Sequence, residues 1–168
     1  MSDSLKSILP SRIEEAAQNV LQLACDRDVP LAAAESCTGG LLAAVLTDIE
    51  GRSHIFERGF VVYSEDAKCD LLGIERRLVD DCGAVSREVA VAMAEGALAH
   101  SRAQLAVSIT GFAGPTKDGE EGLVHFGCLR DGRQMLHREE HFGAIGRDAV
   151  RLAALEVALD MMKEALDP

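Results

Sequence analysis

Apolar and polar positions along the chain follow two repeats, one typical of helices and one typical of buried strands. Four segments carry apolar residues at helical spacing and are predicted helices: 5–28, 38–48, 86–99 and 145–165. Three short apolar runs predict strands: 29–34, 59–63 and 104–109. A shorter helix is expected between a capping Ser64 and Gly73.

A hairpin precedes the last predicted helix. Asp131 and Gly132 stand between two segments that contain apolar residues, 122–129 and 134–142, and Asp-Gly at such a position is typical of a hairpin turn. Helices that alternate with strands predict an α/β fold. We therefore expect a three-layer α/β/α sandwich with a mixed, mostly parallel sheet, in one domain over residues 1–168.

Three predicted strands end in segments that could carry chemistry. These segments are 36–40, 63–68 and 110–115, and each is polar or rich in glycine. Ligand sites of open α/β sheets lie beyond the carboxyl ends of the strands. With neighbouring strands parallel, the three segments converge on one site.

Composition limits the classes of function. Hydrophobic residues make up 48% and charged residues 27%, as in globular proteins. The net charge of −11 opposes binding to nucleic acid or to acidic membranes. The five cysteines are scattered without a C-x-x-C pair, which argues against a disulfide framework and a structural zinc site. With no secretory pattern at the N-terminus and no long apolar run, a cytoplasmic location is expected.

Ser36 is the first candidate for chemistry, because it stands between a predicted strand and a helix start. Unpaired N–H groups and the helix dipole at such a position can stabilise an oxyanion or hold a phosphate. The alternative is that Ser36 or Thr38 is an ordinary N-cap. The neighbouring Cys37 is a rival nucleophile, since a turn of this kind usually exposes only one of two adjacent side chains.

A serine nucleophile needs a base, and Lys68 is the candidate. The G-x-S-x-G motif is absent, and no histidine accompanies the serine pattern. A desolvated lysine can serve as the base, because burial lowers its pKa. Tyr63 could orient this lysine, relay a proton or contact the substrate. The alternatives are a solvated surface lysine and a tyrosine that only packs at the strand end.

Two further segments could hold a ligand. The loop 110–115 contains Gly111 and Gly114, which allow close approach of the backbone, although an ordinary turn has the same composition. Arg147 and Arg151 share one helical face and could bind a phosphate or carboxylate, or could simply pair with nearby acids.

The histidines do not indicate a metal site. His137 and His141 match the H-x-x-E-H zinc signature, which requires a helix, but they fall in a predicted strand where they would be about 13 Å apart. His54 and His125 have no companion at ligand spacing. We therefore expect no metal.

Five blocks of this sequence resemble the C-terminal domain family of CinA, which includes stand-alone nicotinamide-nucleotide amidases. The blocks are 34–40, 56–64, 67–68, 83–86 and 108–115, and the likeness extends over residues 10 to 160. The resemblance implies hydrolysis of nicotinamide mononucleotide to nicotinate mononucleotide and ammonia by a serine amidase without metal or cofactor. Relatives tend to be homodimers, so a homodimer is expected.

The resemblance also implies roles for individual residues. By this resemblance Ser36 corresponds to the family's nucleophile and Lys68 to its base. Tyr63 corresponds to the residue that assists the base. Substrate or oxyanion contacts are expected from the following residues: Cys37, Thr38, Gly39, Gly40, Thr110, Gly111, Gly114 and Arg147.

One departure from the family pattern leaves a second function class open. Many relatives have Lys-Pro-Val-Gly before the next strand, whereas this chain has Glu120 and Glu121 near that place. This acidic loop motivates the alternative of a module that binds a pyridine nucleotide or a protein partner without turnover. A nucleic-acid factor fits poorly with the charge of −11.

Overall fold

The computed structural model describes residues 9–168. In chain order its helices and strands are α1 (Ser11–Arg27), β1 (Leu31–Glu35), α2 (Leu41–Thr47), the 3₁₀ turn η2 (Ser53–Ile55), β2 (Phe56–Val61), α3 (Glu65–Leu72), α4 (Arg76–Cys82), α5 (Arg87–Ala99), β3 (Leu105–Gly111), β4 (Leu123–Arg130), β5 (Leu136–His141) and α6 (Arg147–Leu166).

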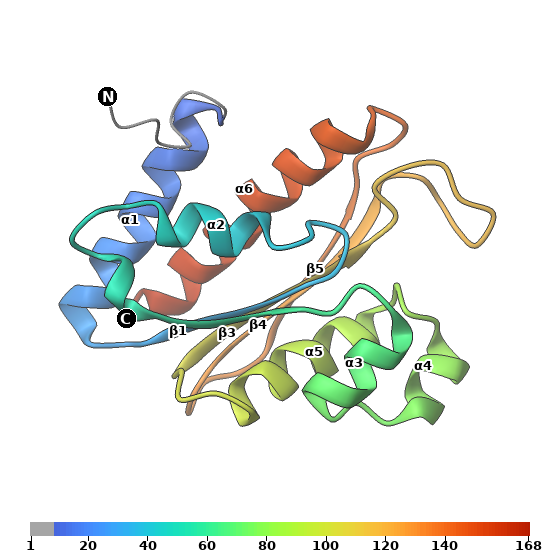
Figure 1. Ribbon diagram of the computed structural model, residues 1–168, viewed down its shortest axis with the longest axis horizontal. Coiled ribbons are helices and arrows are strands. Elements are labelled where there is room, and N and C mark those ends of the chain that lie inside the picture. The colour runs from blue at the N-terminus through green and yellow to red at the C-terminus, as the bar shows by residue number, and fades with distance from the viewer. Residues whose placement is uncertain (1–8) are drawn as a thin grey trace.

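The strands form one mixed sheet in the order β2-β1-β3-β4-β5. β1 is parallel to both β2 and β3, whereas the β3–β4 and β4–β5 pairs are antiparallel, so only β4 runs against the other strands. Helices α1, α2 and α6 cover one face, and α3, α4 and α5 cover the other (Figure 1). The predicted three-layer α/β/α sandwich with a mostly parallel sheet is confirmed.

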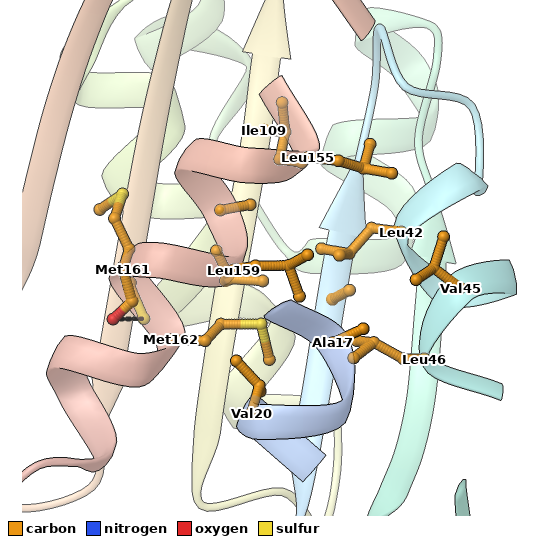
Figure 2. Packing of buried hydrophobic residues seen from close by; sticks show 14 of the residues in the cluster. Ala17, Val20, Leu42, Val45, Leu46, Ile109, Leu155, Leu159, Met161 and Met162 are labelled. Atoms are coloured by element: carbon orange, nitrogen blue, oxygen red, sulfur yellow. Dashed lines mark hydrogen bonds between the residues drawn. The ribbon is translucent and has the colours of Figure 1, made fainter. Parts of the chain in front are cut away.

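The core is divided by the sheet into two apolar clusters. On one face Leu155 and Leu159 of α6 pack with Val20 of α1 and Leu42 of α2 against the sheet (Figure 2). The cluster on the other face is smaller and is centred on α5, with Met93 as a fully buried member. Burial of both faces explains why the central strands are almost entirely apolar in sequence.

Helix starts differ most from the predicted boundaries. The helix predicted from 38 begins at Leu41. Gly39 and Gly40 have φ values of +60° and +96°, which are incompatible with a right-handed helix, so the helix starts only after them. The helix predicted from 145 begins at Arg147, after Gly146 with φ of +96°. The first predicted helix, 5–28, begins at Ser11 after Pro10 in the structure, and its residues 5–8 lie outside the described residues.

Two strands also extend differently from the prediction. Thr110 and Gly111 were expected in a loop but pair with His125 and Val124 of β4, so β3 continues to Gly111. β2 ends at Val61, which leaves Tyr63 beyond the strand. The hairpin at residues 131–132 is confirmed, as are the caps of α3 and α5 by Ser64 and Ser86 and the end of α3 at Gly73.

Candidate active site

Ser36 directly follows β1 in the middle of the sheet. Its N–H donates to the Ile109 carbonyl of β3 at 3.0 Å, so the β1–β3 pairing continues past the last residue of β1. On the other side, the Val62 N–H donates to the Glu35 carbonyl at 2.8 Å. The carboxyl ends of β1, β2 and β3 therefore meet at one edge of the sheet, as the sequence predicts.

Lys68 lies in the first turn of α3 and reaches back to the end of β1. Its Nζ is 2.9 Å from Ser36 Oγ and 3.0 Å from the Val62 carbonyl oxygen. The whole residue is 1% exposed, so the alternative of a solvated surface lysine is wrong. Burial lowers the pKa of Lys68, and the opposing effect of the nearby Cys37, Glu65 and Cys69 is smaller. A neutral amine facing a serine hydroxyl is the arrangement that a Ser-Lys pair requires.

The helix that follows Ser36 is capped by a different residue. The N-cap position of α2 is Gly40, and the Glu35 carboxylate accepts the N–H groups of Leu42 and Ala43 at 3.0 and 2.8 Å. The interpretation of Ser36 or Thr38 as the N-cap is therefore wrong. Because the Glu35 carboxylate accepts the N–H groups at the start of α2, Ser36 Oγ is not used as a cap and can interact with Lys68.

A cavity of about 480 Å³ opens beside this pair. Its wall comes from the ends of β1 and β3, the start of α3 and the loop after β3. The lining residues are Ser36, Cys37, Tyr63, Ser64, Glu65, Lys68, Ala84, Val85, Thr110, Gly111, Phe112, Ala113, Gly114, Pro115, Thr116, Asp118 and Arg147. The three segments that the sequence predicted to converge therefore share one cavity.

Cys37 lines the same cavity but is poorly suited as a nucleophile. Its side chain is buried, and burial raises the pKa of the thiol to about 11. The thiolate is the reactive form of cysteine, so this thiol is unreactive near neutral pH. Ser36 is the better candidate of the two neighbours.

Comparison with known proteins agrees with this geometry. The model of the CinA C-terminal domain family matches residues 13–166. The chain belongs to this family. The CinA match includes the ends of β1 and β3 and the start of α3, which build the cavity.

Relatives of two lengths share this CinA domain. The chain is 43% identical over 155 residues to the nicotinamide-nucleotide amidohydrolase PncC of Escherichia coli K12, covering 90% of this chain and 93% of that protein. It is 45% identical over 139 residues to a CinA-like protein of Syntrophomonas wolfei, of which it spans only 33%. The crystal structure of the competence/damage inducible protein CihA from Agrobacterium tumefaciens superposes with a TM-score of 0.91 at 43% identity, over 95% of this chain and 98% of that one.

Tyr63 stands at the mouth of the cavity in this CinA domain. It is 70% exposed, so the alternative that it only packs at the strand end is wrong. Among the described residues, no hydrogen bond links Tyr63 to Ser36 or Lys68. Its position allows contact with a bound ligand, while Val62 supplies the second hydrogen bond of Lys68 through its carbonyl.

The glycine-rich end of β3, the loop after it and the start of α6 also line the cavity. Thr110 Oγ1 donates to the Ala84 carbonyl at 2.8 Å, which leaves its oxygen able to accept a bond from a ligand. A Cβ at Gly114 would lie 2.8 Å from Arg147 Nη2, so only glycine lets the guanidinium lie this close to the loop backbone. Within residues 9–168, Arg147 forms no ion pair or hydrogen bond, and its charge is available to an anion.

Other predicted contacts lie outside the cavity wall. Thr38, Gly39 and Gly40 belong to the turn after Ser36 but do not line the cavity. Arg151 Nη2 donates to the Thr38 carbonyl at 2.8 Å, so this arginine supports the turn and does not share a ligand site with Arg147. The alternative that Arg151 pairs with nearby acids finds no ion pair in the described part of the chain.

The histidines of the hairpin lie away from the cavity. His137 falls in β5, which confirms the predicted strand. Spacing along the sequence gives His125 no companion, but in the structure His125 Nδ1 lies 3.2 Å from His137 Nε2, because β4 and β5 are antiparallel and His137 stands two residues from Glu139, the partner of His125. Within residues 9–168, no three His, Cys, Asp or Glu side chains lie together in a way that could hold a metal ion.

The acidic loop after Pro115 faces two ways. Asp118 lines the cavity, whereas Glu120 contacts His141 Nδ1 at 3.0 Å and does not line it.

In the part of the chain that the structure describes, no helix is both long and apolar enough to cross a membrane.

Proposed function

We propose that this chain is a nicotinamide-nucleotide amidohydrolase that converts nicotinamide mononucleotide and water to nicotinate mononucleotide and ammonia. The observation that carries the proposal is the buried contact of 2.9 Å between Ser36 Oγ and Lys68 Nζ inside a ligand-sized cavity. The 43% identity to a protein of that name from E. coli, over nearly the full length of both, supports the same activity.

The first half of the reaction forms an ester on Ser36. Neutral Lys68 takes the hydroxyl proton as Oγ attacks the carboxamide carbon, and negative charge develops on the carboxamide oxygen. Among the described residues, the Cys37 N–H has no hydrogen-bond partner in another residue, and because Cys37 lines the cavity we assign this N–H to the oxyanion. Protonated Lys68 then delivers its proton to the nitrogen, the C–N bond breaks, and ammonia leaves.

The second half releases the acid. Water attacks the ester carbon while Lys68 accepts a proton from the water. The bond from carbon to Ser36 Oγ breaks, Lys68 returns the proton to Oγ, and nicotinate mononucleotide dissociates. The pair is thus restored, and no metal or cofactor takes part.

Substrate binding in this proposal uses residues that line the cavity. Arg147 pairs with the phosphate, because guanidinium and phosphate form charge-assisted hydrogen bonds. Thr110 Oγ1 accepts a hydrogen bond from the substrate, and Tyr63 covers the cavity mouth. The close approach at Gly114 gives Arg147 room beside the loop.

The test is the incubation of purified protein with nicotinamide mononucleotide in the presence of EDTA, with ammonia and the acid product both measured. We expect equal amounts of the two products and no effect of the chelator. Loss of activity in EDTA that returns with added metal would contradict the metal-free mechanism.

The alternative of a binding module without turnover is favoured only by the acidic residues Glu120 and Glu121. Calorimetry separates the two functions. Heat of binding for nicotinamide mononucleotide with no product after long incubation would support the module.

Cysteine catalysis is tested by Cys37→Ala, which we expect to keep the activity within about threefold, since burial keeps that thiol protonated.

The proposal extends to the setting of the enzyme. We propose a single domain over residues 1–168, a cytoplasmic homodimer, with small nucleotides as its partners. Light scattering of the purified protein tests the dimer, and fractionation of cells tests the location. A monomer at micromolar concentration would contradict the proposed homodimer.

A further inference from the structure

Glu35 is a buried carboxylate next to the nucleophile, and its bonds go to one short segment. It is 1% exposed. Oε2 accepts hydrogen bonds from Thr38 Oγ1 at 2.6 Å and from the N–H groups of Gly40 and Leu42 at 3.2 and 3.0 Å, and Oε1 accepts the Ala43 N–H at 2.8 Å. All four donors lie within eight residues of Glu35, in the turn after Ser36 or the first turn of α2.

These bonds hold the turn from both of its ends. Glu35 is the last residue of β1, so its backbone is fixed by pairing with Val61 and Ile109. Its side chain spans the turn and holds Thr38 and the start of α2. Ser36 and Cys37 thus lie in a turn that Glu35 holds at one end through its backbone and at the other through its carboxylate.

The arrangement also decides which donors remain available. Glu35 satisfies the N–H groups at the start of α2, and the Gly39 N–H donates to the Ser36 carbonyl at 3.0 Å. Among the described residues, the Cys37 N–H has no such partner. The bonds of Glu35 therefore leave free the donor that the proposed mechanism assigns to the oxyanion.

We propose that Glu35 is a positioning residue for the acylation of Ser36, an inference that rests on the proposed function. It fixes the turn so that Oγ faces Lys68 and the Cys37 N–H faces the carboxamide oxygen that gains negative charge. Glu35 does not line the cavity and has no hydrogen bond to Lys68 or to Ser36 Oγ among the described residues, so it acts through the turn and is not an acid or base of the reaction.

The first test compares kcat and KM of the wild type with those of Glu35→Gln. A glutamine has one acceptor oxygen, so its nitrogen faces at least one donor that it cannot accept, and the turn must shift. Displaced oxyanion donors cost about 10²-fold or more in kcat, and a partial shift is expected to cost about tenfold. KM should stay within about threefold, because Glu35 does not contact the substrate.

A control variant separates positioning from simple loss of stability. Val20→Ala in α1 makes a cavity in the apolar cluster that α1, α2 and α6 form against the sheet; Val20 does not line the active-site cavity, so the change is expected to lower the melting temperature without reducing kcat. If Glu35→Gln and Val20→Ala lower the melting temperature equally and lower kcat equally, Glu35 has only a structural role and the proposal is overturned.

The second test needs no amidase activity. A fluorophosphonate probe forms a P–O bond with an activated serine and releases fluoride, with the hydroxyl proton taken by the base. We expect the rate of Ser36 labelling to fall about tenfold or more in Glu35→Gln and to be unchanged in Val20→Ala. Mass spectrometry of the labelled peptide confirms that Ser36 carries the probe.

The outcomes distinguish the two proposals. An active, labelled wild type with unchanged kcat and labelling rate in Glu35→Gln overturns the role of Glu35 and leaves the proposed function standing. A wild type that neither hydrolyses nicotinamide mononucleotide nor reacts with the probe overturns both. A loss of kcat with unchanged KM and a slower labelling rate supports Glu35 as a positioning residue.

Discussion

At the scale of single residues, the site depends on a lysine whose environment disfavours its charge. Lys68 is among the largest fully buried side chains of the described residues, and it has a serine hydroxyl and a backbone carbonyl as its hydrogen-bond partners. Neither partner carries a charge that would compensate an ammonium group. Desolvation therefore dominates, and the amine is shifted toward the neutral form that can accept a proton.

The pH dependence of the reaction follows from this shift. Because Lys68 must be neutral to act as a base, kcat/KM should rise with pH and level off below the ordinary lysine value of about 10.4. Lys68→Arg stays protonated and is expected to lower kcat by about 10²- to 10⁴-fold. Initial rates measured from pH 6 to 10 check both statements, and a wild-type rate that falls over this range would contradict the role of Lys68.

Tyr63 is expected to act on substrate binding more than on chemistry. It lies exposed at the cavity mouth and has no hydrogen bond to the Ser36–Lys68 pair in the described residues. Tyr63→Ala should raise KM for nicotinamide mononucleotide about tenfold with a smaller change in kcat. Steady-state kinetics give the two constants separately. An unchanged KM with a large loss of kcat would instead place the hydroxyl in the proton transfer.

At the scale of elements, the position of Lys68 depends on how closely α3 packs on α5. The contact is made at Gly96, where an added Cβ would lie 2.3 Å from the Leu72 carbonyl oxygen at the end of α3. Only glycine permits this approach. The first turn of the same short helix carries Lys68, so a shift of α3 would move the amine relative to Ser36.

Gly96→Ala therefore tests packing against helix propensity. Alanine favours a helix by about 1 kcal/mol over glycine, but the overlap with α3 is expected to cost about 1 to 3 kcal/mol and to lower kcat as well. The neighbouring exposed Glu95→Ala should change stability by less than about 0.5 kcal/mol. Urea unfolding of both variants measures the difference. A Gly96→Ala protein as stable and active as the wild type would show that α3 need not lie at this distance.

Much of the architecture could be predicted from the sequence because its signals are local. Apolar runs marked the central strands, and Ser64, Ser86 and the Asp131-Gly132 turn marked caps and hairpin. Boundaries next to glycines were less exact, since the positive φ of Gly39 and Gly40 could not be known in advance. The short helix α4 was not delimited, because its seven residues hold only one fully buried side chain, Val79.

Most of the site was predictable because its residues stand at or just after strand ends, and Arg147 was predicted from the start of the last helix. Ser36, Lys68 and Thr110 were placed by the rule that sites form beyond the carboxyl ends of strands. The cap by Glu35 was missed because Ser and Thr are the usual caps and a glutamate before the turn gives no such signal. The contact of His125 with His137 depends on the pairing of β4 with β5, which spacing along the chain does not reveal.

At the scale of the whole molecule, charge limits the partners of the protein. With 28 acidic and 17 basic residues, the net charge of −11 repels a phosphate backbone. We expect no measurable binding to duplex DNA at about 150 mM salt, where even basic proteins lose much of their affinity. Fluorescence anisotropy with a labelled duplex checks this. Saturable binding at micromolar protein would mean that a local basic surface outweighs the net charge.

The central claim is that Ser36 is the nucleophile of an amide hydrolysis, and the rate of ammonia release from nicotinamide mononucleotide by Ser36→Ala tests it most directly. The account predicts a folded variant that still binds the substrate but releases ammonia at the uncatalysed background, since within residues 9–168 Ser36 Oγ is the only hydroxyl that forms a hydrogen bond with Lys68. A Ser36→Ala protein that releases ammonia at a rate close to that of the wild type would contradict the account.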